Sequence, residues 1–310
     1  MSVSARKDPK SVEPGMLVRL MPSPMARGLL LAVTAGVFFQ CLNATVKLLV
    51  ADMPPLFVAW GRWTMGLLLI APFLLAGAGL KAVRTSQIHL HGLRAVFHTT
   101  GYVLWYLAVA LIPLAEAAAL GFSGPIFVAA GAALFLGETV GPRRWLAVIV
   151  GFVGVLIIVR PGFVALNWGT VMMLASVPVV AASNLVAKKL TARDSPQVIV
   201  FWQSVLATLC FLPFAILDWH LPTWTQLGWL LLAAVFGQMG YLLMTSAYRL
   251  ADISAVQPTV FLGIVWAGLF DFFLFGRSAD LATFAGAAII VASTSVIAHR
   301  EAVAARQRRG

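Results

Sequence analysis

The sequence has few charged residues and very few acidic ones. Of its 310 residues, 11% are charged, and only 11 are aspartate or glutamate. A soluble domain typically has about a quarter of its residues charged, so the composition excludes an ordinary soluble protein. Apolar residues make up 61% of the chain, and the mean hydropathy is +0.93. This composition predicts an integral membrane protein.

Cysteines and metal-binding patterns are also scarce. Cys41 and Cys210 are the two cysteines, and both fall in apolar stretches, which predicts packing residues rather than a disulfide framework. The one dense histidine run, HLHGLRAVFH, contains no Asp, Glu or Cys and matches no usual metal spacing. The motifs HExxH and GxSxG and the P-loop are absent. We therefore expect no cofactor, no metal site and no enzymatic activity.

Long polar segments are confined to the two ends of the chain. The stretch MSVSARKDPKSVEPGM is polar and contains proline, without the apolar segment and cleavage site of a signal peptide. We expect residues 1–25 to form a disordered cytoplasmic tail and the basic residues 300–310 to form a second one. No loop between them is long enough for a separate soluble domain.

Ten apolar runs have about the length, roughly 20 residues, that a helix needs to cross a bilayer. They span residues 27–50, 56–77, 92–111, 115–136, 144–160, 168–188, 197–217, 226–248, 253–275 and 281–298. Short connections containing proline, glycine or charge separate them. The sequence therefore predicts an all-α polytopic membrane protein with ten transmembrane helices.

The basic residues indicate the orientation of these helices. Most of the 22 lysines and arginines fall on one side when both termini are placed in the cytoplasm. The positive-inside rule therefore predicts a multi-pass protein of a bacterial-type inner (plasma) membrane, with both termini cytoplasmic. The net charge of +11 then reflects topology and attraction to anionic membrane lipid, so nucleic acid is not the expected partner.

The two halves of the chain are similar to each other. The segment GYVLWYLAVAL (101–111) aligns with GYLLMTSAYRL (240–250), and the alignment continues without gaps to the last apolar run. Identical residues in this alignment are Gly101 and Gly240, Tyr102 and Tyr241, Leu104 and Leu243, Ala108 and Ala247, Leu111 and Leu250, Phe122 and Phe261, Gly124 and Gly263, and Gly137 and Gly276. Halves with an odd number of helices insert in opposite orientations. We therefore expect two inverted five-helix repeats, 26–162 and 163–299, around a central cavity.

Such a closed unit made from one chain predicts a monomeric carrier of a small-molecule substrate. A channel is the weaker alternative, because channels usually build a polar filter by oligomerisation.

The first helix of each half carries an amide and an ammonium on one face. NATVKLL aligns with NLVAKKL, so that Asn43 matches Asn184 and Lys47 matches Lys188, each pair at i and i+4. In one interpretation the lysines extend to the nearest interface and each Asn bonds a neighbouring helix. In the other, the Asn side chains line the central path and contact substrate.

Two stripes of aromatic and polar residues are candidate walls of the cavity. His98, Tyr102 and Trp105 share one face of the third helix, and Gln238, Tyr241 and Thr245 share one face of the eighth. Such walls suit an amino acid or a planar organic solute. The alternatives are helix packing and interfacial aromatic belts. The full set of candidate substrate contacts is Gln40, Asn43, His98, Tyr102, Trp105, Ser123, Ser183, Asn184, Gln238, Tyr241, Thr245 and Gln257.

Three further residues are candidates for conformational change or coupling. Pro125 and Pro258 interrupt apolar runs, and we expect kinks near them to act in rocking between inward-open and outward-open states. Asp271 lies well within a predicted helix and is a candidate for ion coupling. A structural ion pair with the nearby Arg277 is the alternative, and facilitated export without proton coupling remains open.

Residues 112–162 resemble the EamA-type repeat of the drug/metabolite transporter superfamily. The shared features are Pro125 in the fourth helix, the sequence LGE at its end (136–138), small residues in the fifth helix, and a closing RPG. The second half, with AVQPTVFLGIVWAGLFDFFLFGR, matches less fully, because Arg277 stands where the family has an acidic residue.

This resemblance implies ten helices in two inverted repeats around a cavity for small metabolites. Members of the superfamily include bacterial amino-acid exporters, and others carry drugs, purine-type metabolites, riboflavin or S-adenosylmethionine. The expectation from the sequence is therefore a secondary transporter, most simply an amino-acid exporter, with a carrier for another of these classes as the alternative.

Overall fold

The computed structural model describes residues 23–111, 120–159, 167–263, 265–266, 285–286 and 288–292. This part of the chain is helical and contains no β-strand. The helices are α2 (Pro24–Leu49), α3 (Pro55–Ala78), η1 (Gly79–Val83), α4 (Ile88–Leu111), α6 (Gly124–Phe135), α7 (Pro142–Val159), α8 (Trp168–Leu190), α9 (Pro196–Leu217), α10 (Trp224–Leu250), α11 (Ile253–Val256) and η2 (Gln257–Phe261).

The long helices begin where the sequence supplies capping groups. The Ser23 hydroxyl accepts a hydrogen bond from the Ala26 amide at the start of α2. Asn167 caps α8 in the same way, and Thr223 forms a capping box with Gln226 at the start of α10. These groups satisfy amides that the first helical turn leaves without partners. The boundaries therefore follow the predicted apolar runs closely.

Five of the described helical segments are long and apolar enough to cross a membrane. They are Pro24–Val46, Pro55–Ala76, Trp168–Leu190, Pro196–Leu217 and Trp224–Leu250. Each coincides with a run predicted from the sequence.

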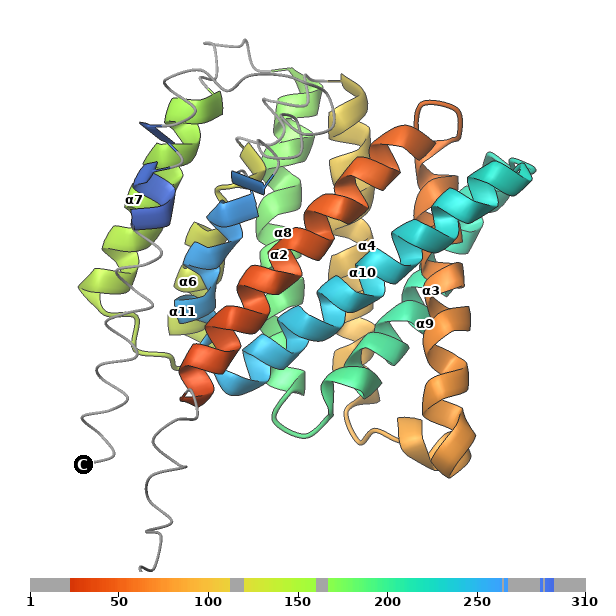
Figure 1. Ribbon diagram of the computed structural model, residues 1–310, viewed down its shortest axis with the longest axis horizontal. Coiled ribbons are helices and arrows are strands. Elements are labelled where there is room, and N and C mark those ends of the chain that lie inside the picture. Colours follow the sequence, from red (N-terminus) through yellow and green to blue (C-terminus); the bar gives the residue numbers. More distant parts are fainter. Residues whose placement is uncertain are drawn as a thin grey trace, which may run out of the picture.

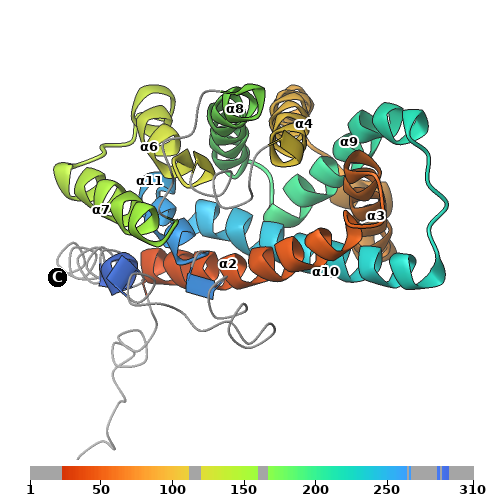
Figure 2. The ribbon, with the colours of Figure 1, turned by 90° about the horizontal axis from the view of Figure 1, so that it is seen from above.

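The helices form two layers. Figure 2 shows α4, α6 and α8 along one side and α2 and α10 along the other, with α3 and α9 at one end of the assembly. Figure 1 shows α2 and α10 side by side, inclined against α4 and α8. The main packing pairs are α2 with α10, α8 with α4, and α3 with α9. In the repeat, α2 corresponds to α8, α4 to α10 and α3 to α9. Exchanging the two halves therefore converts the α2–α10 pair into the α8–α4 pair, as expected for a duplicated unit related by a twofold axis.

Contacts between equivalent residues locate this pseudo-twofold axis. The hydroxyls of Tyr102 and Tyr241, 139 residues apart, lie 3.0 Å from each other. Phe122 and Phe261, also aligned with each other in the repeat, have ring centroids 6.4 Å apart. A residue can contact its own counterpart only close to a twofold axis. The axis therefore passes through the middle of the bundle, near these two pairs.

Two predicted helices are not continuous. The run 115–136 contains a turn at residues 122–123, and α6 begins at Gly124 with Pro125 in its first turn. The run 253–275 begins as the short α11 and passes into the 3₁₀ helix η2, with Pro258 in its first turn. Proline lacks an amide hydrogen and disfavours helical geometry in the residue before it. Pro125 thus follows a turn at the start of α6, whereas Pro258 lies where α11 passes directly into η2.

Candidate functional site

A cavity of about 370 Å³ lies between the two layers, around the pseudo-twofold axis. Its wall is built mainly by α2, α4, α8 and α10, with α6 and η2 at one side. The predicted site residues on this wall are Gln40, Asn43, His98, Tyr102, Trp105, Pro125, Asn184, Tyr241, Thr245 and Gln257. The volume lies within the range of small-molecule sites, roughly 300–1,000 Å³. The two predicted stripes therefore meet at one site that can hold a small metabolite.

Three predicted contacts are engaged elsewhere. The Ser123 hydroxyl donates to the Leu120 carbonyl at 2.6 Å, and the Ser183 hydroxyl donates to the Arg94 carbonyl at 3.4 Å. The Gln238 amide donates to the Ser204 hydroxyl at 2.8 Å. None of the three lines the cavity. Ser183 and Gln238 bond neighbouring helices, whereas Ser123 bonds within its own segment. Asp271 lies outside the described residues.

In the first helix of each half, the amide side chain lines the cavity, whereas the ammonium group that the structure describes, that of Lys188, does not. Asn43 and Asn184 both line the cavity, as the second interpretation of their pattern predicts. Lys188 donates to the carbonyls of Tyr248 and Ala251, at 2.5 and 2.6 Å. Its ammonium thus binds the C-terminal end of α10, where the helix dipole favours a cation. The side chain of Lys47 lies outside the described part.

Aromatic rings form a contiguous patch in the wall of the cavity. The His98 and Tyr102 ring centroids lie 4.4 Å apart, and the Trp63 ring lies 5.2 Å from His98 and 5.1 Å from Tyr241. Trp105 and Tyr106 continue the aromatic lining along α4. Packed rings lose little conformational freedom when a flat ligand stacks on them. The wall therefore offers a rigid, largely apolar surface with a few hydrogen-bonding groups.

Two arginines on the cavity wall were not predicted as site residues. Arg62 of α3 and Arg94 of α4 line the cavity, and each is only 4% exposed. The Arg62 guanidinium lies 4.3 Å from the centroid of the Trp63 ring. Arg94 falls close to the start of the predicted run 92–111, but α4 begins at Ile88, so Arg94 lies inside the helix. A cation within an apolar run is a functional signal in itself and could have identified both.

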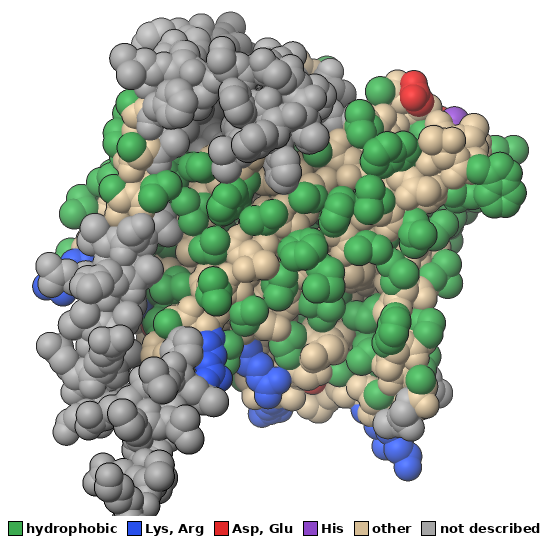
Figure 3. Space-filling view, in the orientation of Figure 1, with side chains coloured by type: hydrophobic (Ala, Val, Ile, Leu, Met, Phe, Trp, Pro, Cys, Tyr) green, Lys and Arg blue, Asp and Glu red, His purple; other side chains and the backbone are tan. Residues whose placement is uncertain are grey.

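A polar network joins the two halves at one end of the bundle. Exposed basic residues gather at the end of the bundle where α2, α7 and α9 begin, which we call the basic end (Figure 3). There the Glu138 carboxylate accepts hydrogen bonds from the Ile253 amide at 2.9 Å, the Ser254 amide at 3.1 Å and the Ser254 hydroxyl at 2.7 Å. Arg144 pairs with Asp252 at 3.0 Å. These bonds join the α6–α7 loop of one half to the start of α11 in the other.

A second buried cluster joins the two halves at the basic end. Asp194, in the loop between α8 and α9, accepts a hydrogen bond from the Thr85 hydroxyl at 2.7 Å. The same carboxylate oxygen lies 2.9 Å from Nε2 of His91. His91 is 2% exposed and Asp194 is 7% exposed. The carboxylate therefore holds the start of α4 against the α8–α9 loop.

Replacing Asp194 with alanine is expected to destabilise the protein by about 2–4 kcal/mol, because the buried partners of a charged group are left without it. Thr85 and His91 would both lose the acceptor they share. Thermal unfolding in detergent measures the effect. Asp52→Ala, at an exposed aspartate, is the control and should leave the melting temperature unchanged. Equal melting temperatures for the two variants would contradict this role of Asp194.

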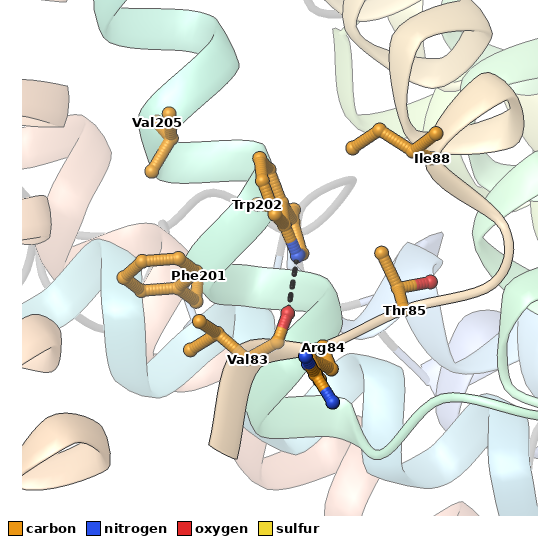
Figure 4. A pocket seen from close by; sticks show the side chains of 7 residues that line it. All are labelled: Val83, Arg84, Thr85, Ile88, Phe201, Trp202 and Val205. Carbon is orange, nitrogen blue, oxygen red and sulfur yellow. Dashed lines mark hydrogen bonds between the residues drawn. The ribbon is translucent and has the colours of Figure 1, made fainter. Parts of the chain in front are cut away.

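A second pocket lies at the basic end, away from the central cavity. It has a volume of about 440 Å³ and is lined by residues of η1, α4 and α9 and of the η1–α4 loop, including Val83, Ile88 and Trp202 (Figure 4). The indole of Trp202 donates to the Val83 carbonyl at 2.9 Å. None of the predicted site residues lines this pocket. The central cavity is therefore the site at which the sequence prediction and the geometry agree.

Comparisons with known proteins agree with this architecture. The model of the EamA-like transporter family matches the chain twice, at residues 26–160 and 167–298. A riboflavin transporter of Rhizobium johnstonii is 32% identical over 283 residues, which cover 90% of this chain and 93% of that protein. The pseudopaline exporter CntI of Pseudomonas aeruginosa is 32% identical over 268 residues, covering 85% and 93%. Neither relative is named as an amino-acid exporter, so amino-acid export receives no specific support.

A solved crystal structure has the same fold. It aligns with a TM-score of 0.75 at 15% sequence identity, covering 91% of this chain and 99% of that one. The double match to one family model confirms the predicted all-α membrane fold with two repeats. The chain belongs to the EamA-like transporter family, within the drug/metabolite transporter superfamily.

Proposed function

We propose that this protein is a secondary transporter that moves a small organic solute with a planar aromatic portion through the central cavity by alternating access. Riboflavin is the first candidate, because a relative with this substrate aligns over most of both chains. The observation that carries the proposal is the cavity itself. It lies on the pseudo-twofold axis between the repeats, which is where inverted-repeat carriers bind substrate, and α2, α4 and α10 each contribute aromatic rings to its wall.

Amino-acid export remains the alternative, and the lining disfavours it. An amino acid presents an ammonium group, which a dry site must match with a carboxylate or several carbonyls. Among the described lining residues there is no Asp or Glu. The charged groups that do line the cavity, Arg62 and Arg94, carry the same sign as an ammonium. The same argument disfavours S-adenosylmethionine, whose sulfonium is a cation.

The distribution of charge supports an orientation. Exposed Lys and Arg side chains at the basic end are Arg27, Lys81, Arg84, Arg143, Lys189, Arg193 and Arg249. Under the positive-inside rule this end faces the cytoplasm of a bacterial-type inner membrane. The cavity would then be closed toward the cytoplasm by the network around Glu138. One chain supplies both repeats, so the working unit is a monomer.

Uptake of radiolabelled riboflavin into proteoliposomes tests the proposal, with Trp105→Ala as the informative variant. Trp105 lines the cavity, and losing one stacked ring costs about 1–3 kcal/mol, so we expect the apparent affinity to fall roughly tenfold. Trp224→Ala is the matched control, because Trp224 is 89% exposed, and it should transport like the parent protein. Saturable uptake of amino acids with no riboflavin uptake would overturn the substrate assignment.

A further inference from the structure

We propose that the transported solute carries an acidic group, a carboxylate or a phosphate, which pairs with Arg94 and Arg62 in the cavity. This inference rests on the proposed function only in taking the central cavity as the transport site. It differs from the proposed function in the charge of the solute: riboflavin carries no acidic group, so a flavin that meets this inference would be a phosphorylated one.

Arg94 is a buried cation with donors that lack partners. Its side chain is 4% exposed, and its Nε and Nη1 atoms are buried without a hydrogen-bond partner. A guanidinium is protonated under all ordinary conditions and presents five N–H donors. Burying such a group without acceptors is strongly unfavourable. A ligand that supplies oxygen acceptors with negative charge removes this cost.

The described residues supply no counterion at this place. The ion pairs of the described part are His91 with Asp194 and Arg144 with Asp252, and none of these four residues lines the cavity. The described lining residues include Arg62 and Arg94 but no Asp or Glu. The described lining is therefore net positive.

Arg62 adds a second cation from another helix. It is also 4% exposed, and its guanidinium lies over the Trp63 ring rather than against a carboxylate. The face of an aromatic ring attracts a cation and offsets part of the cost of burying it. It has no lone pair that could accept a hydrogen bond from the guanidinium. Arg62 and Arg94 line the same cavity as His98. An acidic group in the cavity therefore meets a cation on α3 and another on α4.

The geometry also indicates the kind of molecule that carries the acid. A guanidinium binds carboxylates and phosphates through paired N–H donors. The aromatic rings of Tyr102, Trp105 and Tyr241 are on the same wall. An aromatic ring joined to a carboxylate or to a phosphate satisfies both parts of the site at once. A small inorganic anion would satisfy only the arginines.

Two pairs of probes test this inference, each differing in one acidic group. Flavin mononucleotide carries a phosphate that riboflavin lacks. Indole-3-acetate carries a carboxylate where indole-3-acetamide carries a neutral amide. Equilibrium binding to the purified full chain in nanodiscs gives the ratio of affinities within each pair. We expect the acid to bind at least roughly tenfold more tightly than its neutral partner in one pair, which identifies phosphate or carboxylate as the group recognised.

Variants attribute that preference to the arginines. Arg94→Gln is expected to bring the ratio close to one, whereas Arg94→Lys should retain part of it because the charge remains. Arg193→Gln removes the same charge at an exposed site and should leave the ratio unchanged. If Arg94→Gln does not fold, Arg62→Gln replaces it. In the parent protein, sodium chloride and sodium phosphate are then tested as competitors for binding of the probes. Loss of the preference in Arg62→Gln would support the inference.

Specific outcomes overturn the inference. The first is equal affinity for the acid and its neutral partner in both pairs. The second is an unchanged preference in Arg94→Gln. The third is displacement of every organic acid by millimolar chloride, which would identify an inorganic anion as the occupant. Binding of none of the four probes also overturns it for aromatic acids. Riboflavin uptake that depends on Trp105 could still be observed in each of the first two cases, so failure here is distinguishable from failure of the proposed function.

Discussion

Glu138→Gln should lower the transport rate by roughly tenfold or more, because the charged carboxylate holds the basic end of the cavity closed. It accepts hydrogen bonds from the Ile253 amide and from both the amide and the hydroxyl of Ser254. A carrier that alternates between two states works only while neither state is strongly favoured. An amide in place of the carboxylate weakens these bonds, and a shift of about 1.4 kcal/mol changes the ratio of the two states tenfold.

Two measurements on the same samples check this expectation. The first is the rate of solute exchange in proteoliposomes. The second is labelling of a cysteine introduced into the cavity wall by a membrane-impermeant reagent added from the basic end, which should become faster in the variant. Asp218→Asn, at an exposed position, is the matched control. Unchanged exchange together with unchanged labelling in Glu138→Gln would show that this network does not close the cavity.

Gly101→Ala is expected to destabilise the protein by about 1–3 kcal/mol, the usual cost of overpacking a tight contact. A Cβ at Gly101 would lie 2.6 Å from Cγ2 of Val180 and 3.3 Å from the Val180 amide nitrogen. The side chain of Val180 can rotate, but its backbone belongs to α8 and cannot move alone. Helices α4 and α8 would have to separate, and this contact forms one wall of the cavity, so we also expect weaker solute binding.

Gly92→Ala provides the control within the same helix. A Cβ at Gly92 meets no atom within 4 Å, and alanine favours a helix over glycine by up to about 1 kcal/mol. This variant should therefore be as stable as the parent or slightly more stable in thermal unfolding. A fall in melting temperature of equal size in both variants would contradict the role assigned to the contact with Val180.

The equivalent contact in the other half should be more tolerant. The three atoms nearest to a Cβ at Gly240 all belong to the Phe39 ring, the closest at 2.8 Å, and a ring can tilt without moving its helix. Phe39 and Val180 occupy corresponding positions of α2 and α8 when Asn43 is aligned with Asn184. The duplication thus reproduces the position of the contact, while its side chain differs between the halves. We therefore expect Gly240→Ala to destabilise the protein less than Gly101→Ala.

Apolar length and internal similarity were enough to predict much of the architecture. The runs that became α8 and α9 were predicted to within a few residues, because each is bounded by capping residues or prolines. The pairing of Tyr102 with Tyr241 in sequence became a direct contact in space. Periodicity identifies the face of a helix on which a residue lies, and the repeat identifies its counterpart.

Partners across the bundle could not be predicted in this way. Nothing in the sequence around Glu138 indicates that its carboxylate reaches the amides of residues 253 and 254, because that contact joins segments more than a hundred residues apart. Arg94 fell at the edge of the predicted run 92–111, whereas α4 begins at Ile88 and places Arg94 inside the helix. Gln238 shares a face with Tyr241, but its amide turns toward Ser204. Side-chain direction depends on neighbours that a single sequence does not show.

The network around Glu138 has a consequence for the direction of transport. In the alignment of the halves, the residue corresponding to Glu138 is Arg277, so the duplication does not repeat this carboxylate in the sequence. We therefore expect an empty carrier to favour the state in which the Glu138 network is intact. Such a preference would make the rates of influx and efflux saturate at different solute concentrations.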